Sequence, residues 1–349
     1  MIKVLVVEDS AVVREFLVHI LGADPDLQVI GTACDGESAI EAVQRLQPDV
    51  ITMDIHMPKM DGLQATRRIM EVHPVPIVIV SGSSDPHDVA MTFRATEAGA
   101  VAALRRPSGI GHPQYEATAK ELVQTVKLMS EVKVVRRWQR RETAVAQPLE
   151  TLSKLKSAKV GVVALGASTG GPPALQTILA GLPGDFPAPV LIVQHMASGF
   201  VHGFAEWLGQ SSALPVQLAS HGETILPGRV YVAPDEFQMK IERGGIIALS
   251  KDAPESGLRP SVSYLFRSLV DAYGGEAVAV LLTGMGRDGA EELKALRERG
   301  AVTIAQDKDS SVVHGMPGEA IKLDAAQLIL PPEKIAPLLV GLVNGKKLK

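Results

Sequence analysis

Short apolar, β-branched segments alternate with helical segments along most of the chain, and this alternation restricts the possible folds more than any other feature. Predicted strands of the first part lie at residues 3–7, 50–53, 76–80 and 101–104. Further along, predicted strands lie at residues 160–165, 189–193, 229–232, 277–282 and 302–305. Strands that are joined through helices run parallel and are buried on both faces. The sequence therefore predicts an α/β fold with two doubly wound parallel-sheet domains, to which residues 238–249 add a small β-hairpin.

The distribution of charge divides the chain into three segments. Residues 1–126 carry 10 basic and 17 acidic side chains, residues 127–159 carry 9 and 3, and the remainder carries 16 and 19. Together with the strand pattern, these counts predict a first domain at 1–125, a basic linker at 126–158 and a second domain at 159–349. A solvated linker helix explains the basic run at 136–141 better than a nucleic-acid surface does, so we expect no nucleic-acid partner.

The composition argues against a membrane protein and against disulfide bonds. Of the 349 residues, 46% are hydrophobic and 21% are charged, and no apolar run reaches the roughly 18 residues that span a bilayer. The apolar start is too short for a signal peptide and runs into Glu8 and Asp9. Cys34 is the only cysteine, so no intrachain disulfide can form. We expect a cytoplasmic, monomeric chain without membrane insertion.

Acidic side chains follow two predicted strands of the first domain. Glu8 and Asp9 come after the first strand, and Asp54 comes after the strand at 50–53. Functional sites of such sheets lie beyond the carboxyl ends of the strands. Three carboxylates in one place repel one another unless a hard cation joins them, and oxygen ligands favour Mg²⁺. The sequence thus predicts a magnesium site, near which Ser81 offers a hydroxyl and Arg106 a positive charge.

These residues resemble the receiver domain of bacterial two-component response regulators, which has a flavodoxin-like fold. The resemblance implies that Asp54 accepts a phosphoryl group from a histidine kinase. It also implies that Mg²⁺ is held by Asp9, by Glu8 through water, by Asp54 and by the backbone carbonyl of His56. Ser81 would then sense the phosphoryl oxygens.

Two positions depart from the pattern of that family. Arg106, the other residue expected to sense the phosphoryl group, stands where the family has lysine. Ala103 stands where the family has an aromatic switch residue. The guanidinium of arginine is planar and the ammonium of lysine is a compact point charge, so this exchange alters the site. Alanine has no ring, so it cannot act as a rotating aromatic switch.

In the second domain, Ser168 lies between glycines directly after the predicted strand at 160–165. Gly166 to Gly171 allow a tight turn, and Pro172 and Pro173 suit the first turn of a following helix. Backbone N–H groups and the helix dipole at such a turn can stabilise an oxyanion, and the pattern matches the G-x-S-x-G nucleophile turn. A purely steric use of small residues is the alternative that this segment leaves open.

Two more polar residues follow strands of the same domain. His195 comes after the strand at 189–193, and Asp288 comes after the strand at 277–282. A neutral imidazole can remove the proton of Ser168, and a carboxylate can orient that imidazole, so the three residues form a candidate catalytic triad. His221 and His314 compete for the role of base, and Asp288 could instead cap a helix. The order Ser, His, Asp excludes the usual α/β-hydrolase fold.

Five motifs in order resemble the catalytic domain of bacterial chemotaxis protein-glutamate methylesterases. They are Gly166-Ala-Ser-Thr-Gly-Gly, Gln194-His-Met, Arg259-Pro-Ser, Leu282-Thr-Gly-Met-Gly-Arg-Asp-Gly-Ala and Gly315-Met-Pro. The resemblance implies a Rossmann-like esterase domain whose substrates are γ-glutamyl methyl esters, and certain glutamines, of methyl-accepting chemoreceptors. It implies no cofactor for the esterase reaction, and control of access to Ser168 by phosphorylation at Asp54.

Backbone donors for the tetrahedral oxyanion are expected near Ser168. The resemblance makes the N–H of Met285 one candidate, and the nucleophile-turn geometry makes the N–H of Thr169 another. The position of Arg259 would allow its side chain to contact a carboxylate of the substrate. Its spacing from the other motifs does not by itself indicate a role, so we do not include it in the candidate triad.

Two other functions were weighed against the esterase. A dinucleotide-binding oxidoreductase would use the glycines at 166–171 as a phosphate cradle, but Ser168 occupies the position of the second glycine of G-x-G-x-x-G. A phosphorylation-dependent DNA-binding regulator would need a basic second domain, and residues 160–349 carry 16 basic and 19 acidic side chains. Both alternatives are therefore weaker than the esterase.

Overall fold

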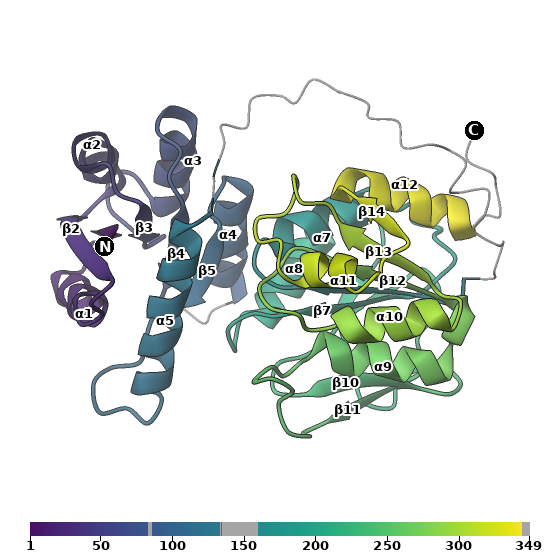
Figure 1. Ribbon diagram of the computed structural model, residues 1–349. Helices are drawn as coiled ribbons and strands as arrows, with labels where there is room; N and C mark the ends of the chain where they lie inside the picture. Colours follow the sequence, from purple (N-terminus) through teal and green to yellow (C-terminus); the bar gives the residue numbers. More distant parts are fainter. Residues whose placement is uncertain (83–85, 133, 135–159, 344–349) are drawn as a thin grey trace. The chain divides into compact units, whose positions relative to one another are not determined.

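The computed structural model describes residues 1–82, 86–132, 134 and 160–343 (Figure 1). The chain forms two compact units, Met1–Thr143 and Ala144–Lys349, and each is described by itself. The predicted domain limits at 125 and 158 stay predictions. Most of the predicted linker, including the basic run at 136–141, lies outside the described residues.

Strands and helices alternate through the described part of the first unit. They are β1 (Ile2–Val7), α1 (Ala11–Gly22), β2 (Leu27–Ala33), α2 (Gly36–Leu46), β3 (Val50–Met53), α3 (Gly62–Val72), β4 (Ile77–Ser81), α4 (Pro86–Glu97), β5 (Ala102–Arg105) and α5 (Tyr115–Ser130). The strands pair in parallel in the order β2-β1-β3-β4-β5. This is the flavodoxin order, in which the chain turns back at the junction of β1 and β3.

Alternate residues of the central strands fill two cores, one on each face of this sheet. Leu5, Val7, Ile51, Met53 and Ile79 pack with residues of α2, α3 and α4. The intervening strand residues are also buried, as are apolar residues of α1 and α5. Burial on both faces explains why these strands are continuous apolar runs that end abruptly in polar residues.

The loop between β3 and α3, which follows Asp54, is closed tightly. A Cβ atom on Gly62 would lie only 2.0 Å from the carbonyl oxygen of Asp54, so a side chain has no room there. Asp61 caps α3 by accepting a hydrogen bond from the backbone of Gln64. Lys59 joins the loop to the buried Asp35 at 2.6 Å. These contacts fix the backbone that carries Asp54.

The second unit repeats the alternation around a longer sheet. Its elements are β6 (Val162–Ala167), α7 (Gly171–Ala180), β7 (Val190–Gln194), α8 (Val201–Ser211), β8 (Val216–Leu218), β9 (Val230–Val232), β10 (Gln238–Glu242), β11 (Ile246–Ser250), α9 (Val262–Ala272), β12 (Ala277–Leu281), α10 (Ala290–Glu298), β13 (Val302–Gln306), α11 (Met316–Lys322), β14 (Leu328–Leu330) and α12 (Pro332–Val343). A short 3₁₀ turn, Gly274–Glu276, precedes β12.

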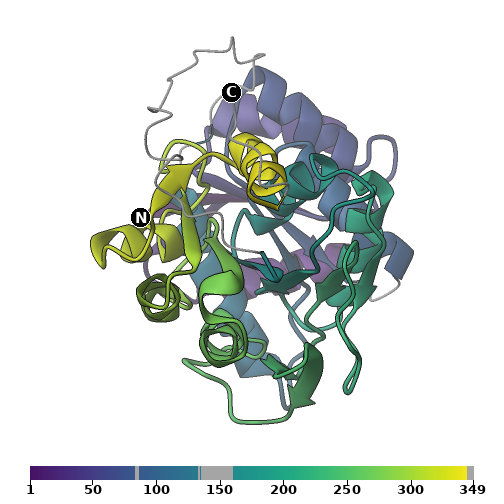
Figure 2. The same cartoon turned by 90° about the vertical axis from the view of Figure 1, so that its right-hand side faces the viewer.

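Seven of these strands form one parallel sheet in the order β14-β13-β12-β6-β7-β9-β8. Figure 2, together with Figure 1, shows helices on both of its faces. The chain enters at β6, builds one half of the sheet through β7, β8 and β9, and then crosses to β12 to build the other half. The switch point of this sheet therefore lies between β6 and β12.

The remaining two strands form the antiparallel hairpin β10–β11. The hairpin packs beneath α9 in Figure 1, and Ile241 and Ile247 join the same core as Leu265 and Leu269 of that helix. Alternate residues of β6, β7 and β12 face this core, which α10 and α11 complete. The hairpin thus holds α9 against the sheet.

The predicted α/β class, with two doubly wound parallel sheets and a hairpin, is confirmed. Sequence patterns gave no range for β2 in the first sheet, and they missed β8 and β14, which have three residues each and form opposite edges of the second sheet. The strand predicted at 160–165 runs instead from Val162 to Ala167, so it ends directly before Ser168. Within the described residues, no helix has the length and apolar character needed to cross a bilayer.

Each unit contains its own sheet and its own cores, so we expect residues 160–349 to fold when produced alone. Calorimetry should show one cooperative thermal transition for this fragment. A fragment that melts without a cooperative transition would contradict the independence of the second unit. The fragment 1–132 provides the matching measurement for the first unit.

Candidate active site

Ser168 lies in the turn between β6 and α7, at the switch point of the second sheet. The backbone N–H of Gly171 donates to the carbonyl oxygen of Ser168 at 2.8 Å, which closes the turn. Gly170 has a φ of 77°, a conformation that favours glycine. A Cβ atom on Gly171 would lie 2.0 Å from the side-chain oxygen of Gln194. Gly171 is therefore required by the close approach of the next strand, and Gly170 by its backbone conformation.

His195 and Asp288 meet across the sheet edge. His195 directly follows β7, and Asp288 lies in the loop after β12, the strands on either side of β6. The Nε2 atom of His195 lies 2.8 Å from Oδ2 of Asp288, and the two side chains are only 9% and 6% exposed. The imidazole and the carboxylate thus form a nearly buried hydrogen-bonded pair.

The backbone of Ser168 is tied to that of His195. The backbone N–H of His195 donates to the carbonyl oxygen of Ala167 at 2.9 Å. The side-chain amide of Gln194 donates at 2.8 Å to the carbonyl oxygens of both Ser168 and His195. Within the described residues, no direct hydrogen bond joins the Ser168 hydroxyl to His195. Catalytic hydrogen bonds of this kind often tighten only when substrate binds.

Asp288 is surrounded by hydrogen-bond donors. The Ser261 hydroxyl and the backbone N–H of Ser263 donate to its Oδ1 atom at 2.8 and 3.0 Å, and the N–H of Val262 donates to Oδ2 at 2.6 Å. These groups form the N-terminal turn of α9. Burial would raise the pKa of Asp288, but hydrogen bonds from His195 and Ser263 outweigh burial and hold this pKa at about 2. Asp288 is therefore ionised at neutral pH.

The expected oxyanion donors lie in the two segments that surround Ser168. Thr169 follows Ser168, and Met285 is exposed and follows Gly284, on which a Cβ atom would lie 2.6 Å from that of Ser168. In the described part of the chain, the backbone N–H groups of Thr169 and Met285 donate to no protein acceptor. Both are thus available to an added ligand, and their roles stay predictions.

The competing residues lie in other surroundings. Nδ1 of His221 accepts a hydrogen bond from the backbone of Leu249 on the hairpin. His314 lies beside Ser311, and burial lowers the pKa of its imidazole. The Arg259 guanidinium donates to backbone carbonyls of its own loop at 3.3 and 3.4 Å. Of the three candidate bases, His195 is the one that the structure joins to Asp288.

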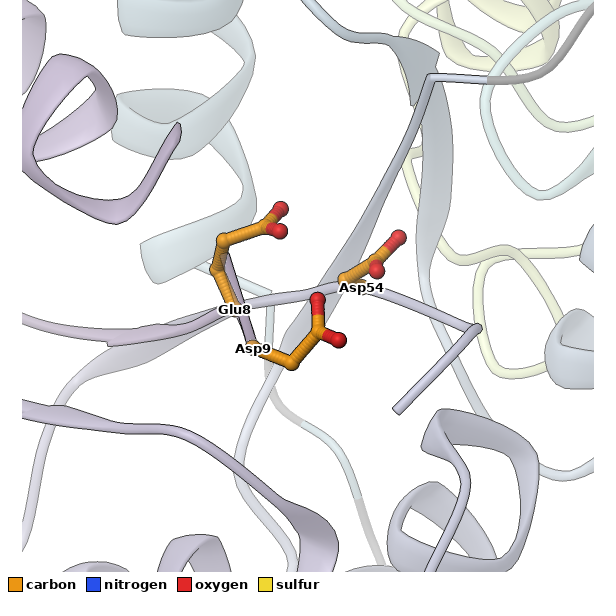
Figure 3. Close-up of side chains that lie close together, drawn as sticks. All are labelled: Glu8, Asp9 and Asp54. Carbon is orange, nitrogen blue, oxygen red and sulfur yellow. The ribbon is translucent and has the colours of Figure 1, made fainter. Parts of the chain in front are cut away.

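A second cluster lies at the switch point of the first sheet. Ligand oxygens of Glu8, Asp9 and Asp54 all lie within 4.8 Å of one another, and Figure 3 shows the three carboxylates around one common space. Burial, and then the Asp54 charge, raises the pKa of Glu8 to about 7, and burial raises the pKa of Asp54. Three hard oxygen donors that destabilise one another in this way fit a divalent cation such as Mg²⁺.

Arg106 extends over this acidic cluster. One of its terminal nitrogens lies 3.3 Å from Oε2 of Glu8, and its guanidinium packs against Gly82. Ser81 is buried at the end of β4, and His56 lies two residues after Asp54. Ala103 is half-buried against the core on β5, where it pairs with Ile79 of β4. The roles expected of Ser81, Arg106 and the His56 carbonyl stay predictions.

Three residues near the triad were not singled out from the sequence. Gln194, Ser261 and Gly284 lie inside the sequence motifs given above, but the sequence alone assigns them no role. Gln194 links Ser168 to His195, Ser261 donates to Asp288, and Gly284 lets the chain pass close to Ser168. Spacing along the chain gives no signal for such contacts, because they depend on the pairing of distant strands.

Comparison with protein families matches both units. A family model described as CheB methylesterase matches residues 163–339, and one described as response regulator receiver domain matches residues 4–112. The first range contains Ser168, His195 and Asp288, and the second contains the acidic cluster with Asp54. Both resemblances seen in the sequence are confirmed.

Individual relatives match over nearly the whole chain. A protein-glutamate methylesterase/protein-glutamine glutaminase of Nitrosospira multiformis is 62% identical over 98% of this chain and 97% of its own length. A protein of the same description from Geobacter metallireducens is 61% identical over 99% of this chain and all of its own length. The crystal structure of the Thermotoga maritima CheB methylesterase catalytic domain is 38% identical, with a TM-score of 0.52, and covers 53% of this chain and all of its own.

The lowered pKa of Asp288 predicts a pH dependence of stability. A carboxyl whose folded-state pKa lies below its usual 3.8 stabilises the fold above about pH 4, and this contribution is lost as the pH falls towards about 2. The free energy of unfolding of the unaltered chain should therefore exceed that of Asp288→Asn by a margin that shrinks by about 2 kcal/mol between about pH 5 and pH 2. Urea denaturation of both proteins measures this margin, and a constant margin would contradict the assigned pKa.

Proposed function

The chain belongs to the CheB methylesterase family, in the form that carries a receiver domain, and we propose that Ser168, His195 and Asp288 carry its esterase reaction. The reaction is hydrolysis of glutamate γ-methyl esters, together with deamidation of glutamines, on methyl-accepting chemoreceptors. The observation that carries the assignment is the buried 2.8 Å hydrogen bond between His195 and Asp288, beside the glycine-flanked Ser168.

Acylation begins with the hydroxyl of Ser168. Since Nε2 of His195 is bonded to Asp288, Nδ1 is the ring nitrogen that remains to take the hydroxyl proton. The Ser168 oxygen attacks the side-chain carbonyl of the substrate, and the carbonyl oxygen becomes an oxyanion. The N–H groups of Met285 and Thr169 stabilise this charge, and the loss of one such donor typically raises the barrier by about 2.7–4 kcal/mol.

The same groups complete both reactions. The imidazolium of His195 gives its proton to the departing methoxide or, for a glutamine, to the amide nitrogen, which departs as ammonia. Water, deprotonated by His195, then attacks the acyl-enzyme and releases a glutamate side chain and the free Ser168. Ionised Asp288 stabilises the imidazolium in each step. Every step is carried by side chains and backbone groups of the chain, so the proposed esterase reaction uses no cofactor.

The first unit supplies control. We infer that Asp54 is phosphorylated by a chemotaxis histidine kinase, with a magnesium site formed by Glu8, Asp9, Asp54 and the carbonyl of His56. A bound Mg²⁺ supplies positive charge to the oxygens of the phosphoryl group. Ser81 contacts those oxygens from the end of β4. Arg106 adds a planar guanidinium that can donate two parallel hydrogen bonds, where a lysine would offer a point charge.

The proposed partners follow from this chemistry. The substrates are methylated glutamates on the cytoplasmic parts of chemoreceptors, and the phosphoryl donor is a cytoplasmic kinase, so we propose a cytoplasmic location. The dinucleotide-binding and DNA-binding alternatives are not favoured, because a receiver model and a methylesterase model match the two units and relatives over nearly the full length carry the methylesterase/glutaminase description.

The nucleophile can be tested directly. Ser168→Ala should abolish methanol release from methylated chemoreceptor, because no other group can form the acyl-enzyme. Vapour-phase capture of labelled methanol measures the rate, and an unchanged melting temperature shows that the fold is intact. Turnover by this variant at the rate of the unaltered chain would remove Ser168 from the mechanism.

Control by the receiver is tested with beryllofluoride, which mimics a phosphoryl group on aspartate. Methanol release should rise by about fivefold or more when beryllofluoride and Mg²⁺ are added together. Asp54→Asn should abolish this response and keep the basal rate. Equal rates with and without beryllofluoride would show that a receiver with Arg106 and Ala103 does not regulate the esterase.

A further inference from the structure

Asp288 uses both of its oxygens, and the two differ in their partners. Oδ2 accepts from His195 and from the backbone of Val262. Oδ1 accepts from the hydroxyl of Ser261 at 2.8 Å and from the backbone of Ser263 at 3.0 Å. Ser261 donates to this carboxylate through its side chain, as His195 does. The orientation of Asp288 therefore depends on Ser261 as well as on the helix backbone.

The hydroxyl of Ser261 is itself held in one orientation. Ser261 is fully buried and is the N-cap of α9, where its oxygen accepts from the backbone of Tyr264 at 3.3 Å. A hydroxyl has one proton to donate. Because its oxygen accepts from Tyr264, that proton is directed to Asp288. An N-cap side chain that accepts a hydrogen bond but has no proton to donate would still cap α9. It would leave Oδ1 of Asp288 without the hydrogen bond that Ser261 donates.

Gln238 fixes the backbone of Ser261 from the hairpin. Gln238 lies on β10, is fully buried and accepts the backbone N–H of Ser261 at 2.9 Å. Its side-chain amide donates to the carbonyl oxygen of Leu258 at 3.1 Å, which holds the loop before Ser261. A chain of buried hydrogen bonds thus runs from the hairpin through Gln238 and Ser261 to Asp288 and His195.

We propose that Ser261, held in place by Gln238, is a positioning residue of the esterase site. Its hydroxyl fixes the plane of the Asp288 carboxylate so that Oδ2 faces Nε2 of His195. This inference rests on the proposed function of the triad. A group that orients the carboxylate acts on the rate of the chemical steps, because the imidazolium forms only during reaction. A group that only caps the helix acts on stability.

The test is a double-mutant cycle in the full chain with methylated chemoreceptor as substrate. Ser261→Ala should lower kcat about tenfold and leave KM nearly unchanged, since it removes one hydrogen bond to a charged group. In the Asp288→Ala background the same change should have no further effect on the residual rate, because its target is gone. An unchanged kcat, or an equal loss in both backgrounds, would overturn the proposal.

Ser268→Ala is the matched control. Ser268 lies on the same helix and also makes two hydrogen bonds, to Leu265 and to Ile241, but neither involves the triad. This variant should retain the kcat of the unaltered chain, even where its melting temperature falls. A loss of kcat equal to that of Ser261→Ala would assign both effects to helix α9 as a whole and overturn the positioning role.

Urea denaturation distinguishes failure of this inference from failure of the proposed function. It is measured on the unaltered chain, on Ser261→Ala, on Asp288→Ala and on the variant that carries both changes. The change in unfolding midpoint of the double variant should be smaller than the sum of the changes for Ser261→Ala and Asp288→Ala. This expectation does not depend on which substrate the chain hydrolyses. Should Ser168→Ala release methanol as fast as the unaltered chain, the proposed function is wrong, and non-additive midpoints still support the Ser261 contact. Additive midpoints would overturn that contact and with it the inference.

Discussion

In a doubly wound parallel sheet the strand order reverses at one position. The connections that follow the two strands there pass over opposite faces of the sheet, and the sites of both units depend on this feature. In the first unit this position lies between β1 and β3, where Glu8, Asp9 and Asp54 meet. In the second it lies between β6 and β12, where Ser168 lies beside the loop of Asp288. Because connections leave on opposite faces there, a crevice opens at the strand ends, and polar groups gather in it although the rest of each sheet is apolar. The location of both sites follows from topology before any side chain is considered.

The two sites treat their carboxylates in opposite ways. In the first unit, burial and mutual repulsion raise the pKa values of Glu8 and Asp54, so the acidic cluster is incomplete without added positive charge. In the second, Asp288 is also buried, but donors from His195 and the start of α9 keep its pKa at about 2. One site therefore suits a cation and a phosphoryl group, which arrive and leave. The other suits a permanent charge that must not change during the reaction.

How much the sequence revealed depended on the kind of contact. The convergence of Ser168, His195 and Asp288 could be expected because each follows an apolar strand, and parallel strands bring such positions to one edge. The receiver cluster was found for the same reason. The part played by Ser261 could not be predicted, because it requires the hairpin to hold the start of α9 against a loop 27 residues further along the chain. The short edge strands β8 and β14 were missed because three residues carry too little periodicity to be distinguished from a loop.

The amide of Gln194 has a consequence for how signals can reach the esterase. By donating to the carbonyl oxygens of Ser168 and His195 at 2.8 Å, it joins the main chain of Ser168 to that of His195. The two strand ends then move together as one rigid piece. A regulatory signal cannot work by drawing the serine and the histidine apart without breaking a buried amide clamp. Regulation that leaves this clamp intact can act on the entry of substrate, on the side chains of Ser168 and His195, or on the loops that carry Asp288 and Met285.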